Sequence, residues 1–370
     1  MKKKMLALLL ALSMTATLFA CGGAETTEEG TAEETTTEEA TEEAELTKVT
    51  WNYGSSGNVL VTIANEMGYF AEEGIEIETV EATQNMDAMA LLAAGKVDVV
   101  SNAGTSNPLQ QIAQGVDITV FGGHMVEGCM PVIAKAGTEW NGIESFIGES
   151  VAVNPSYFAF TGAVMDLGYE DPLDPEVVDW QVYSSYDDAL IAVQNGEVKY
   201  ALQGTQNNYG LQTLIEAGEI EIVSYQSEIM ENYSCCRMVA QTDWVNDNPD
   251  TVKAIIRALL RAQSWYEANK EEAVSLHAAL IGQEDEYVAA YMMDDEHYFV
   301  NADPLKNGVV RAWEILDATG YLGEDCQIDI LDHINTELYE EALAEATELY
   351  GDEAPEFYEA QLTFFEENNK

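Results

Sequence analysis

The chain has 370 residues, 47% of them hydrophobic, and its 67 acidic and 15 basic side chains give a formal charge of −52. This length is enough for two compact lobes rather than a single core. The excess of negative charge excludes nucleic acid and anionic lipid headgroups as binding partners, because both repel an acidic surface.

Residues 1–20 have the form of a secretory signal peptide. A basic start at residues 2–4 precedes an apolar run too short to span a bilayer as a permanent helix. The end of this segment, Leu18-Phe19-Ala20 followed by Cys21, resembles the lipobox of bacterial lipoproteins. The resemblance implies that Cys21 is lipidated and anchors the protein at the extracytoplasmic face of the cell membrane. The Lys-rich start and the long Glu/Thr spacer resemble those of Gram-positive proteins, which favours the outer face of a Gram-positive cell over a periplasm. An ordinary signal peptide with a coincidental cysteine is the alternative.

Residues 21–47 predict a disordered acidic spacer. From residue 22 onward this segment consists of Glu, Thr, Ala and Gly, apart from Leu46, and it contains no basic residue. Such a segment cannot bury enough apolar surface to offset its ordering entropy. A partly helical Glu/Ala segment is the alternative.

From residue 48 onward, short apolar runs alternate with amphipathic stretches, which is typical of an α/β protein with open sheets. Asn58 is expected to cap a helix that ends at Gly68, and Asn107-Pro108 to begin a helix as cap and first-turn proline. The expected strands cover residues 49–53, 75–80 and 97–100, with a helix at about 85–94. Each strand ends in a polar loop, at the edge where open α/β sheets bind ligands.

The same order of elements returns further along the chain. Asn154-Pro155 is expected to begin a helix that ends at Gly168. The expected strands cover residues 151–153, 178–183 and 198–202, and a helix covers residues 187–194. Strands at residues 129–134 and 237–240 are expected to leave the first lobe and to return to it. Two such crossings predict a hinge, with the binding site in the cleft between the lobes.

Several segments resemble one family of binding proteins. Residues 64–77 resemble the Ala-x-x-x-Gly-Tyr/Phe-Phe-x-x-x-Gly-Leu/Ile-x-Val stretch of the nitrate, sulfonate, taurine and thiamine-precursor binding proteins. Residues 91–99 resemble their Leu-x-x-Gly-x-x-Asp element, residues 189–198 repeat it, and Asn248-Pro249 resembles the start of their long returning helix. The resemblance implies an α/β, two-lobed type II periplasmic binding protein fold with a hinge and an interlobe cleft.

Members of this family are solute-binding proteins of ABC importers. The resemblance therefore implies a small-molecule ligand, and as partners the ABC permease subunits with their cytoplasmic ATPase; we expect a monomer. Lobe 1 is expected at residues 48–135 and 237–323, and lobe 2 at residues 136–236. Residues 324–370 extend beyond the family pattern and predict an acidic helical extension, to which we assign no function.

Cysteine and histidine give no sign of a metal or a cofactor. The four histidines are scattered, and no CxxC or HExxH spacing occurs. The cysteines of the mature fold, Cys129, Cys235, Cys236 and Cys326, are expected to be buried free thiols. A bridge between the neighbours Cys235 and Cys236 is disfavoured because its geometry is strained.

In the first lobe the candidate ligand-binding residues lie at the end of one strand and in three loops that follow strands. Backbone N–H groups and hydroxyls before a helix suit a polar head group, and an aromatic ring can stack on a ligand ring. Ordinary turn, capping and core roles are the alternatives. In the third loop His124 can donate to a ligand and Glu127 can bind a cation, unless both are solvated. These candidates are Tyr53, Ser55, Ser56, Asn58, Asn102, Thr105, His124 and Glu127.

In the second lobe the candidates lie at the start of one helix and after one strand. Amides there can recognise the donor and acceptor edge of a heterocycle. These candidates are Asn154, Tyr157, Phe160, Thr161, Gln203 and Gln206. Sulfonate-binding members of the family often carry small hydroxyl residues at this helix start, whereas this chain carries three aromatic residues, Tyr157, Phe158 and Phe160.

These loops contain no Arg or Lys, and Arg237 is the nearest cation in the sequence, with a structural ion pair as its alternative role. We therefore expect a neutral or cationic ring compound, such as a pyrimidine, a thiamine precursor or a flavin-like nutrient. A sulfonate, nitrate or taurine-type anion is one alternative. Others are a pyrimidine-synthase-like enzyme and a ligand-sensing or adhesive lipoprotein. No local Ser/His/Asp or Cys/His arrangement supports the enzyme.

Overall fold

The computed structural model describes residues 46–54, 57–82 and 87–370. Ala44–Lys370 form one compact unit. The expected signal peptide, the lipidation site Cys21 and nearly all of the spacer lie outside the described residues, as do Ser55 and Ser56. None of the helices in the described part of the chain is both long enough and apolar enough to cross a bilayer.

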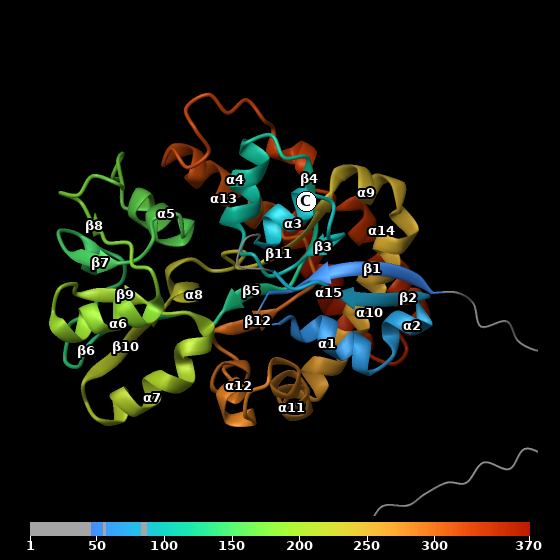
Figure 1. Cartoon of the computed structure of the whole chain (residues 1–370), viewed down its shortest axis with the longest axis horizontal. Helices are drawn as coiled ribbons and strands as arrows, with labels where there is room; N and C mark the ends of the chain where they lie inside the picture. Colours follow the sequence, from blue (N-terminus) through green and yellow to red (C-terminus); the bar gives the residue numbers. More distant parts are fainter. Residues whose placement is uncertain (1–45, 55–56, 83–86) are drawn as a thin grey trace, which may run out of the picture. The chain divides into compact units, whose positions relative to one another are not determined.

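The first sheet has the strand order β2-β1-β3-β11-β4 (Figure 1). The strands β1, β2 and β3 are parallel, and β11 runs antiparallel to β3 and β4. These strands are β1 (Thr47–Asn52), β2 (Ile75–Thr79), β3 (Val99–Val100), β4 (Ile118–Gly123) and β11 (Arg237–Gln241). The four strands predicted here from the sequence are confirmed in position.

The second sheet has the strand order β10-β6-β9-β7-β8. It contains the parallel strands β7, β8 and β9, and β6 runs antiparallel to β9 and β10. These strands are β6 (Pro131–Lys135), β7 (Ser150–Ala152), β8 (Asp179–Trp180), β9 (Tyr200–Leu202) and β10 (Ile220–Tyr225). β8 is shorter than predicted, and the strand expected to leave the first lobe is β6. A separate ribbon pairs β5 (Met125–Gly128) with β12 (Tyr298–Val300).

Helices surround both sheets (Figure 1). Those near the first sheet are α1 (Val59–Glu66), α2 (Tyr69–Glu72), α3 (Ala88–Ala93), α4 (Ser106–Ala113), α9 (Thr242–Asp247), α10 (Pro249–Ala268), α11 (Lys270–Ile281), α12 (Asp285–Met292), α13 (Lys306–Ala318), α14 (Glu337–Tyr350) and α15 (Pro355–Asn369). Those of the second sheet are α5 (Phe158–Asp166), α6 (Tyr186–Asn195), α7 (Asn208–Glu216) and α8 (Gln226–Ile229). Short 3₁₀ turns are η1 (Glu144–Phe146), η2 (Thr205–Asn207) and η3 (Ile330–His333).

The predicted helix starts have different outcomes. Asn58 caps α1, because its Oδ1 accepts from the N–H groups of Leu60 and Val61. Asn107 was expected to cap a helix that begins at Pro108, but Thr105 is the cap and α4 begins at Ser106, two residues earlier. Proline is tolerated at position 108 because the first N–H groups of a helix are unpaired anyway. Asn154 is likewise not a helix cap. It forms a turn in which its Oδ1 accepts from Ser156, and α5 begins only at Phe158.

Buried apolar side chains do not separate cleanly into one cluster per sheet. One cluster contains Val239 of the first sheet together with Val151 of the second. Helix α13 joins them, since Ile315 packs so closely on α5 that a Cβ at Gly162 would lie 2.4 Å from its Cδ1. The two sheets are therefore connected through α13 as well as through the chain crossings.

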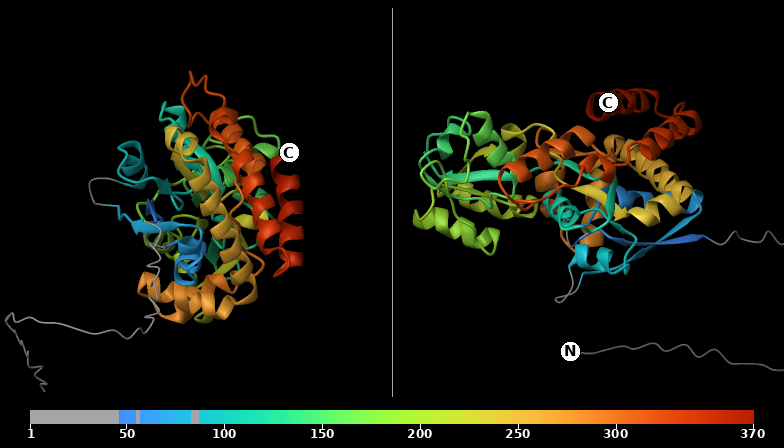
Figure 2. Two further views of the ribbon diagram at one scale, coloured as in Figure 1. Left: turned by 90° about the vertical axis from the view of Figure 1, so that its right-hand side faces the viewer. Right: turned by 90° about the horizontal axis from the view of Figure 1, so that it is seen from above.

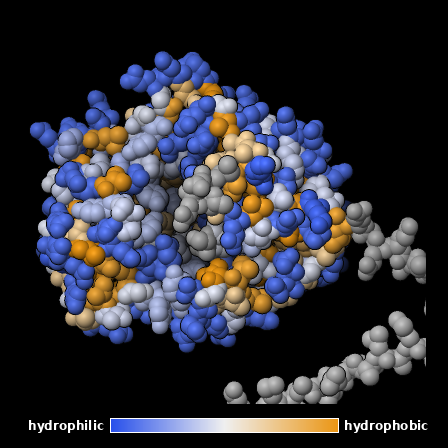
Figure 3. All heavy atoms as spheres, viewed as in Figure 1, coloured by the Kyte–Doolittle hydropathy of each residue, from blue (hydrophilic) through white to orange (hydrophobic). Residues whose placement is uncertain are grey.

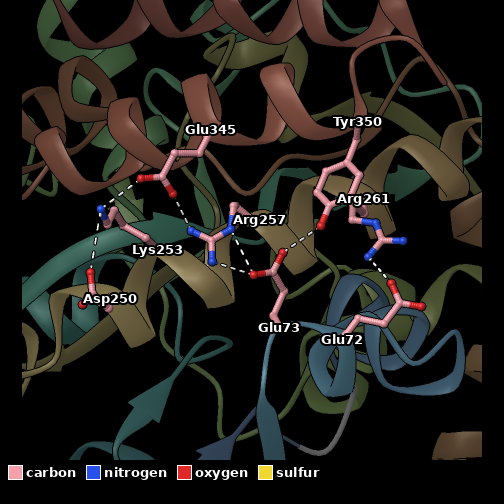
Figure 4. A network of polar contacts seen from close by, with 8 residues as sticks. All are labelled: Glu72, Glu73, Asp250, Lys253, Arg257, Arg261, Glu345 and Tyr350. Carbon is pink, nitrogen blue, oxygen red and sulfur yellow. Dashed lines mark hydrogen bonds and ion pairs between the residues drawn. The ribbon is translucent and has the colours of Figure 1, made fainter.

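Beyond residue 323 an irregular stretch with the turn η3 leads to the helices α14 and α15. Helix α14 packs along α10, as the red and gold helices of Figure 2 show. Acidic side chains of α14 and α2 meet a basic stripe on α10 (Figure 4). In this network Arg257 donates to Glu73 and Glu345, and Lys253 lies 3.0 Å from Glu345. The acidic extension is thus attached to the first sheet's helical layer by ion pairs.

Candidate ligand-binding site

A cavity of about 730 Å³ lies where the loops of both sheets meet the ends of α11 and α12. Figure 3 shows a mostly hydrophilic surface with a hollow near the centre of this face. Six tyrosines line the cavity: Tyr157, Tyr186, Tyr233, Tyr287, Tyr291 and Tyr298. The other lining side chains are amides, hydroxyls, thiols, thioethers, two histidines and a few apolar groups. No Asp, Glu, Lys or Arg is among the described residues that line it.

Six residues predicted from the sequence line this cavity: Asn102, Thr105, His124, Asn154, Tyr157 and Gln206. They come from loops of both sheets, which the chain brings together only after two crossings. The side chain of Asn102 donates to the carbonyl of Gly57 at 2.7 Å, and that of Thr105 donates to the carbonyl of Ser234. These bonds fix the loop after β3 against the neighbouring walls of the cavity.

His124 is held in the wall without a hydrogen-bond partner. Its side chain is 1% exposed, and neither ring nitrogen has a partner in the structure. Burial, together with the charges of His277 and Arg237, lowers the pKa of His124 to about 3. The imidazole is therefore neutral at pH 7 and offers one N–H donor and one acceptor.

Gln226, at the start of α8, also presents an unpaired polar atom in the cavity wall. Its side chain is 3% exposed, and its Oε1 has no partner. A buried carbonyl oxygen without a donor costs about 1–3 kcal/mol. A ligand with an N–H group would remove this cost at Gln226 and part of the same cost at His124.

Three predicted site residues of the first lobe do not line the cavity. The hydroxyl of Tyr53 forms a hydrogen bond with that of Thr79 in the neighbouring edge strand β2, with 2.9 Å between the two oxygens. The side chain of Asn58 already forms hydrogen bonds within the protein: its Oδ1 caps α1 and its Nδ2 donates to the hydroxyl of Ser101. Glu127 accepts from the backbone N–H of Asn232 in the β5 ribbon, and partial burial raises its pKa.

Three predicted residues of the second lobe are also absent from the lining. Phe160 stacks on Phe146 in the core, with 5.9 Å between ring centroids, and Thr161 bonds back to carbonyls of its own turn. Both fall on the buried side because α5 begins at Phe158 rather than after Asn154. The amide of Gln203 donates to the carbonyls of Tyr186 and Leu202.

Arg237 serves the fold through hydrogen bonds to the backbone rather than through the ion pair expected as its alternative role. Its guanidinium donates to the backbone carbonyls of Asp303 at 2.6 Å and of Met125 at 2.7 Å. It is 1% exposed and is not among the residues that line the cavity, and burial lowers its pKa to about 10. The cavity therefore receives no hydrogen bond from this cation.

Sequence reasoning missed most of the tyrosines. Tyr186 begins α6, Tyr233 lies on the return crossing, and Tyr287 belongs to α12. The hydroxyl oxygens of Tyr157 and Tyr186 lie 2.8 Å apart. The signal that was available is the number of tyrosines, 18 in the chain. Their convergence depends on long-range packing, which no local pattern encodes.

The neighbours Cys235 and Cys236 also line the cavity and are free thiols, with 3.8 Å between their sulfurs. The thiol of Cys236 donates to Oδ1 of Asn102 at 3.1 Å. The same S–H proton can instead be donated to the sulfur of Cys235, and this alternative hydrogen bond lowers the pKa of Cys235 and raises that of Cys236. Within the described part of the chain, no group of three or more His, Cys, Asp or Glu side chains is arranged to hold a metal ion.

The fold is that of the periplasmic binding proteins, as the sequence predicted. The structure of the periplasmic aliphatic sulphonate binding protein SsuA from Escherichia coli matches 79% of this chain and 92% of its own, with a TM-score of 0.60 at 16% identity. The ligand binding component of an ABC-type import system from Staphylococcus aureus matches 80% of this chain and 99% of its own, with a TM-score of 0.59 at 12% identity.

Within this class the chain belongs to the NMT1/THI5-like family, whose model matches residues 58–273, more than half of the chain. Curated relatives from Schizosaccharomyces pombe and Candida albicans are named 4-amino-5-hydroxymethyl-2-methylpyrimidine phosphate synthase. They are 24% identical over 210 residues and 25% identical over 235 residues. The matches cover 54% and 58% of this chain, and 59% and 65% of the relatives, so the chain spans about three fifths of their length.

Proposed function

We propose that the protein is the solute-binding component of an ABC importer and that it captures a neutral or cationic ring compound such as a pyrimidine. The observation that carries the proposal is the lining of the main cavity, which has six tyrosines and no charged side chain among the described residues. Tyrosine rings stack on a ligand ring, whereas an anion would find no Arg or Lys with which to pair.

The unpaired polar atoms in the cavity wall indicate which hydrogen-bonding groups the ligand carries. Oε1 of Gln226 accepts only, so its partner on the ligand is an N–H or O–H group. The neutral His124 adds one donor and one acceptor. An aromatic heterocycle with an exocyclic amino group and a ring nitrogen supplies both kinds of partner, and an aminopyrimidine is a small ring of this kind.

The setting of this function is the one that the sequence predicts. A lipid on Cys21 holds the protein at the extracytoplasmic face of the cell membrane, where it delivers the solute to a permease coupled to a cytoplasmic ATPase. Capture occurs when lobe 2, residues 136–236, closes on lobe 1, and a differential affinity of about 5.5 kcal/mol is enough to drive closure. Small-angle scattering that shows no compaction with bound ligand would contradict this step.

The test is a thermal-shift and calorimetric screen of the compact unit, residues 44–370. The panel contains 4-amino-5-hydroxymethyl-2-methylpyrimidine, riboflavin, spermidine, taurine, nitrate and bicarbonate. A ligand at about 100 times its dissociation constant adds about 2.7 kcal/mol of stability, which shifts the melting temperature by several degrees. We expect this shift for the pyrimidine and not for taurine or nitrate.

Gln226→Leu tests whether the cavity itself is the site. The variant removes the unpaired oxygen, so affinity for the pyrimidine should fall by about tenfold. The matched control Gln212→Leu changes the same residue type at an exposed position of α7 that does not line the cavity. Equal affinities in both variants would remove the cavity assignment, and a taurine or nitrate response would favour the anion alternative.

The names of the yeast relatives favour an enzyme as the second candidate function. A binding protein returns its ligand unchanged, whereas a synthase converts or produces it. Mass spectrometry of the protein solution after prolonged incubation, both alone and with the pyrimidine, distinguishes the two. A pyrimidine phosphate formed in either sample would establish the enzyme, whereas its absence together with recovery of the intact pyrimidine supports binding.

A further inference from the structure

A second cavity, of about 720 Å³, adjoins the first on the side of the second sheet. Five residues line both: Asn154, Tyr157, Tyr186, Gln206 and Tyr287. The hydrogen bond between the hydroxyls of Tyr157 and Tyr186 belongs to this shared wall. We call the first cavity the inner compartment and the second the outer compartment.

Gly204 permits the close packing of the shared wall. A Cβ at this position would lie 2.6 Å from the ring of Tyr186 and 2.7 Å from the amide of Gln206. Both contacts are shorter than any that real Cβ atoms make, so a side chain here would push the tyrosine or the amide away. The wall that separates the two compartments therefore depends on a glycine.

The outer compartment differs from the inner one in its charge. Five tyrosines line it, including Tyr183 and Tyr209, and Asp187 at the start of α6 is the one charged side chain among its described lining residues. The rings of Tyr209 and Tyr287 lie 6.1 Å apart, centroid to centroid, and connect α7 with α12. Aromatic faces and a carboxylate without a competing Lys or Arg form a favourable environment for an organic cation.

We propose that the outer compartment binds the positively charged part of an elongated ligand whose ring lies in the inner compartment. The ring half of this statement rests on the proposed function, whereas the cation half rests on the tyrosines and Asp187. Cation–π attraction and the carboxylate act on the same charge, and the chain's net charge of −52 raises the local concentration of cations. The compartment thus selects for a ligand with two parts.

Three probes separate the two halves of the proposal in calorimetric titrations of residues 44–370. The first is 4-amino-5-hydroxymethyl-2-methylpyrimidine, the ring alone. The second is thiamine, in which a similar aminopyrimidine is joined to a cationic thiazolium ring. The third is choline, an organic cation without an aromatic ring. We expect thiamine to bind about tenfold more tightly than the pyrimidine, and choline to bind in the millimolar range.

Two variants assign the added affinity to the outer compartment. Asp187→Asn should weaken thiamine and choline binding by roughly threefold, with the pyrimidine unchanged, because Asp187 is exposed and its pairing is screened. The control Glu197→Gln removes the same charge just beyond the other end of α6, at a position outside both cavities, and should change nothing. If the control variant weakened thiamine binding equally, the loss of affinity would come from the change in net charge alone, and the proposal would be overturned.

The outcomes for the two proposals are distinct. If the pyrimidine binds and thiamine binds no more tightly, the outer compartment is not a cation site, although the proposed function stands. If choline binds in a manner that depends on Asp187 while neither pyrimidine probe binds, the outer compartment stands and the ring assignment fails. If none of the three probes binds, both are overturned.

Discussion

The inner compartment and the interface between α10 and α14 differ sharply in the number of charged side chains and in how polar groups are paired. At the interface, Lys253 and Arg257 pair with Glu345 of α14, and Arg261 pairs with Glu72 of α2 (Figure 4). In the cavity wall, no charged side chain is present among the described residues, yet polar atoms of His124 and Gln226 are unpaired. At the interface the basic side chains are paired within the protein, whereas in the cavity wall the polar atoms of His124 and Gln226 are left for a ligand to pair.

This comparison assigns different costs to mutations in the two regions. A change at the interface should lower the free energy of unfolding and leave ligand affinity unaltered. A change of an unpaired group in the cavity should weaken ligand binding without lowering the free energy of unfolding. The following three predictions test this separation, beginning with the largest effect.

Arg257→Met should cause the largest loss of stability. The arginine side chain is 16% exposed, and Glu73, which it contacts, is 8% exposed and would be left without its cation. Removal of one partner from such a pair costs about 2–3 kcal/mol, less than for a fully buried pair. Urea unfolding measures the loss, and calorimetry should show unchanged pyrimidine affinity.

Lys48→Met is the control for this change. It breaks an ion pair with Glu76 in which the two side chains are 65% and 52% exposed, so its effect should be close to zero. An equal loss of stability in both variants would mean that the network contributes no more than an isolated surface pair.

Asp303→Asn should remove a pH dependence of the free energy of unfolding that arises from this buried carboxyl. Asp303 is buried, and desolvation raises its pKa from 3.8 to about 6. Because the folded state holds the proton more tightly, this carboxyl contributes stability fully below about pH 4, and the contribution is lost as the pH rises through about 6. Relative to Asp303→Asn, the wild type should therefore lose about 2 kcal/mol between pH 4 and pH 7.5.

Urea unfolding of both proteins at the two pH values provides the measurement. The variant keeps an acceptor for the N–H of Leu305 and the side chain of Asn369, which contact the carboxylate in the wild type. A constant difference between the proteins at the two pH values would show that Asp303 titrates in the folded state as it does in the unfolded chain.

His124→Leu should give the smallest effect and the one most specific to ligand binding. Affinity for the pyrimidine should fall by about 1–1.5 kcal/mol, the value of one lost hydrogen bond. Stability at pH 7 should stay the same or rise, because an unpaired buried imidazole is replaced by an apolar group. Loss of stability with unchanged affinity would place His124 among the structural residues instead.

The sequence allowed prediction of the features that local patterns encode. Strand order along the chain, the cap at Asn58 and the proline start of α10 follow from short segments, and the structure contains them. Six of the predicted binding residues line the cavity for a related reason: loops after strands gather at one sheet edge. The wrong helix start at Asn154 shows the limit of such local patterns. Helix α5 begins at Phe158 instead, and Phe160 and Thr161 lie in the core rather than in the cavity wall.

The remaining part of the site depends on packing between distant segments. Tyr233 and Tyr287 reach the cavity from the return crossing and from α12, segments whose own sequences contain no binding motif. The absence of charge from the lining is likewise a property of the assembled wall. Arg237 follows the lining residue Cys236 in the sequence, but its guanidinium binds the carbonyls of Met125 and Asp303 and so does not contribute a charge to the lining.

The most direct test of the account is a side-by-side calorimetric titration of residues 44–370 with 4-amino-5-hydroxymethyl-2-methylpyrimidine and with taurine. We predict saturable 1:1 binding of the pyrimidine and no detectable heat from taurine, because the cavity offers tyrosine rings and neutral hydrogen-bonding groups. Binding of taurine without binding of the pyrimidine would contradict the central claim, since it would show that a site without a charged lining nevertheless selects an anion.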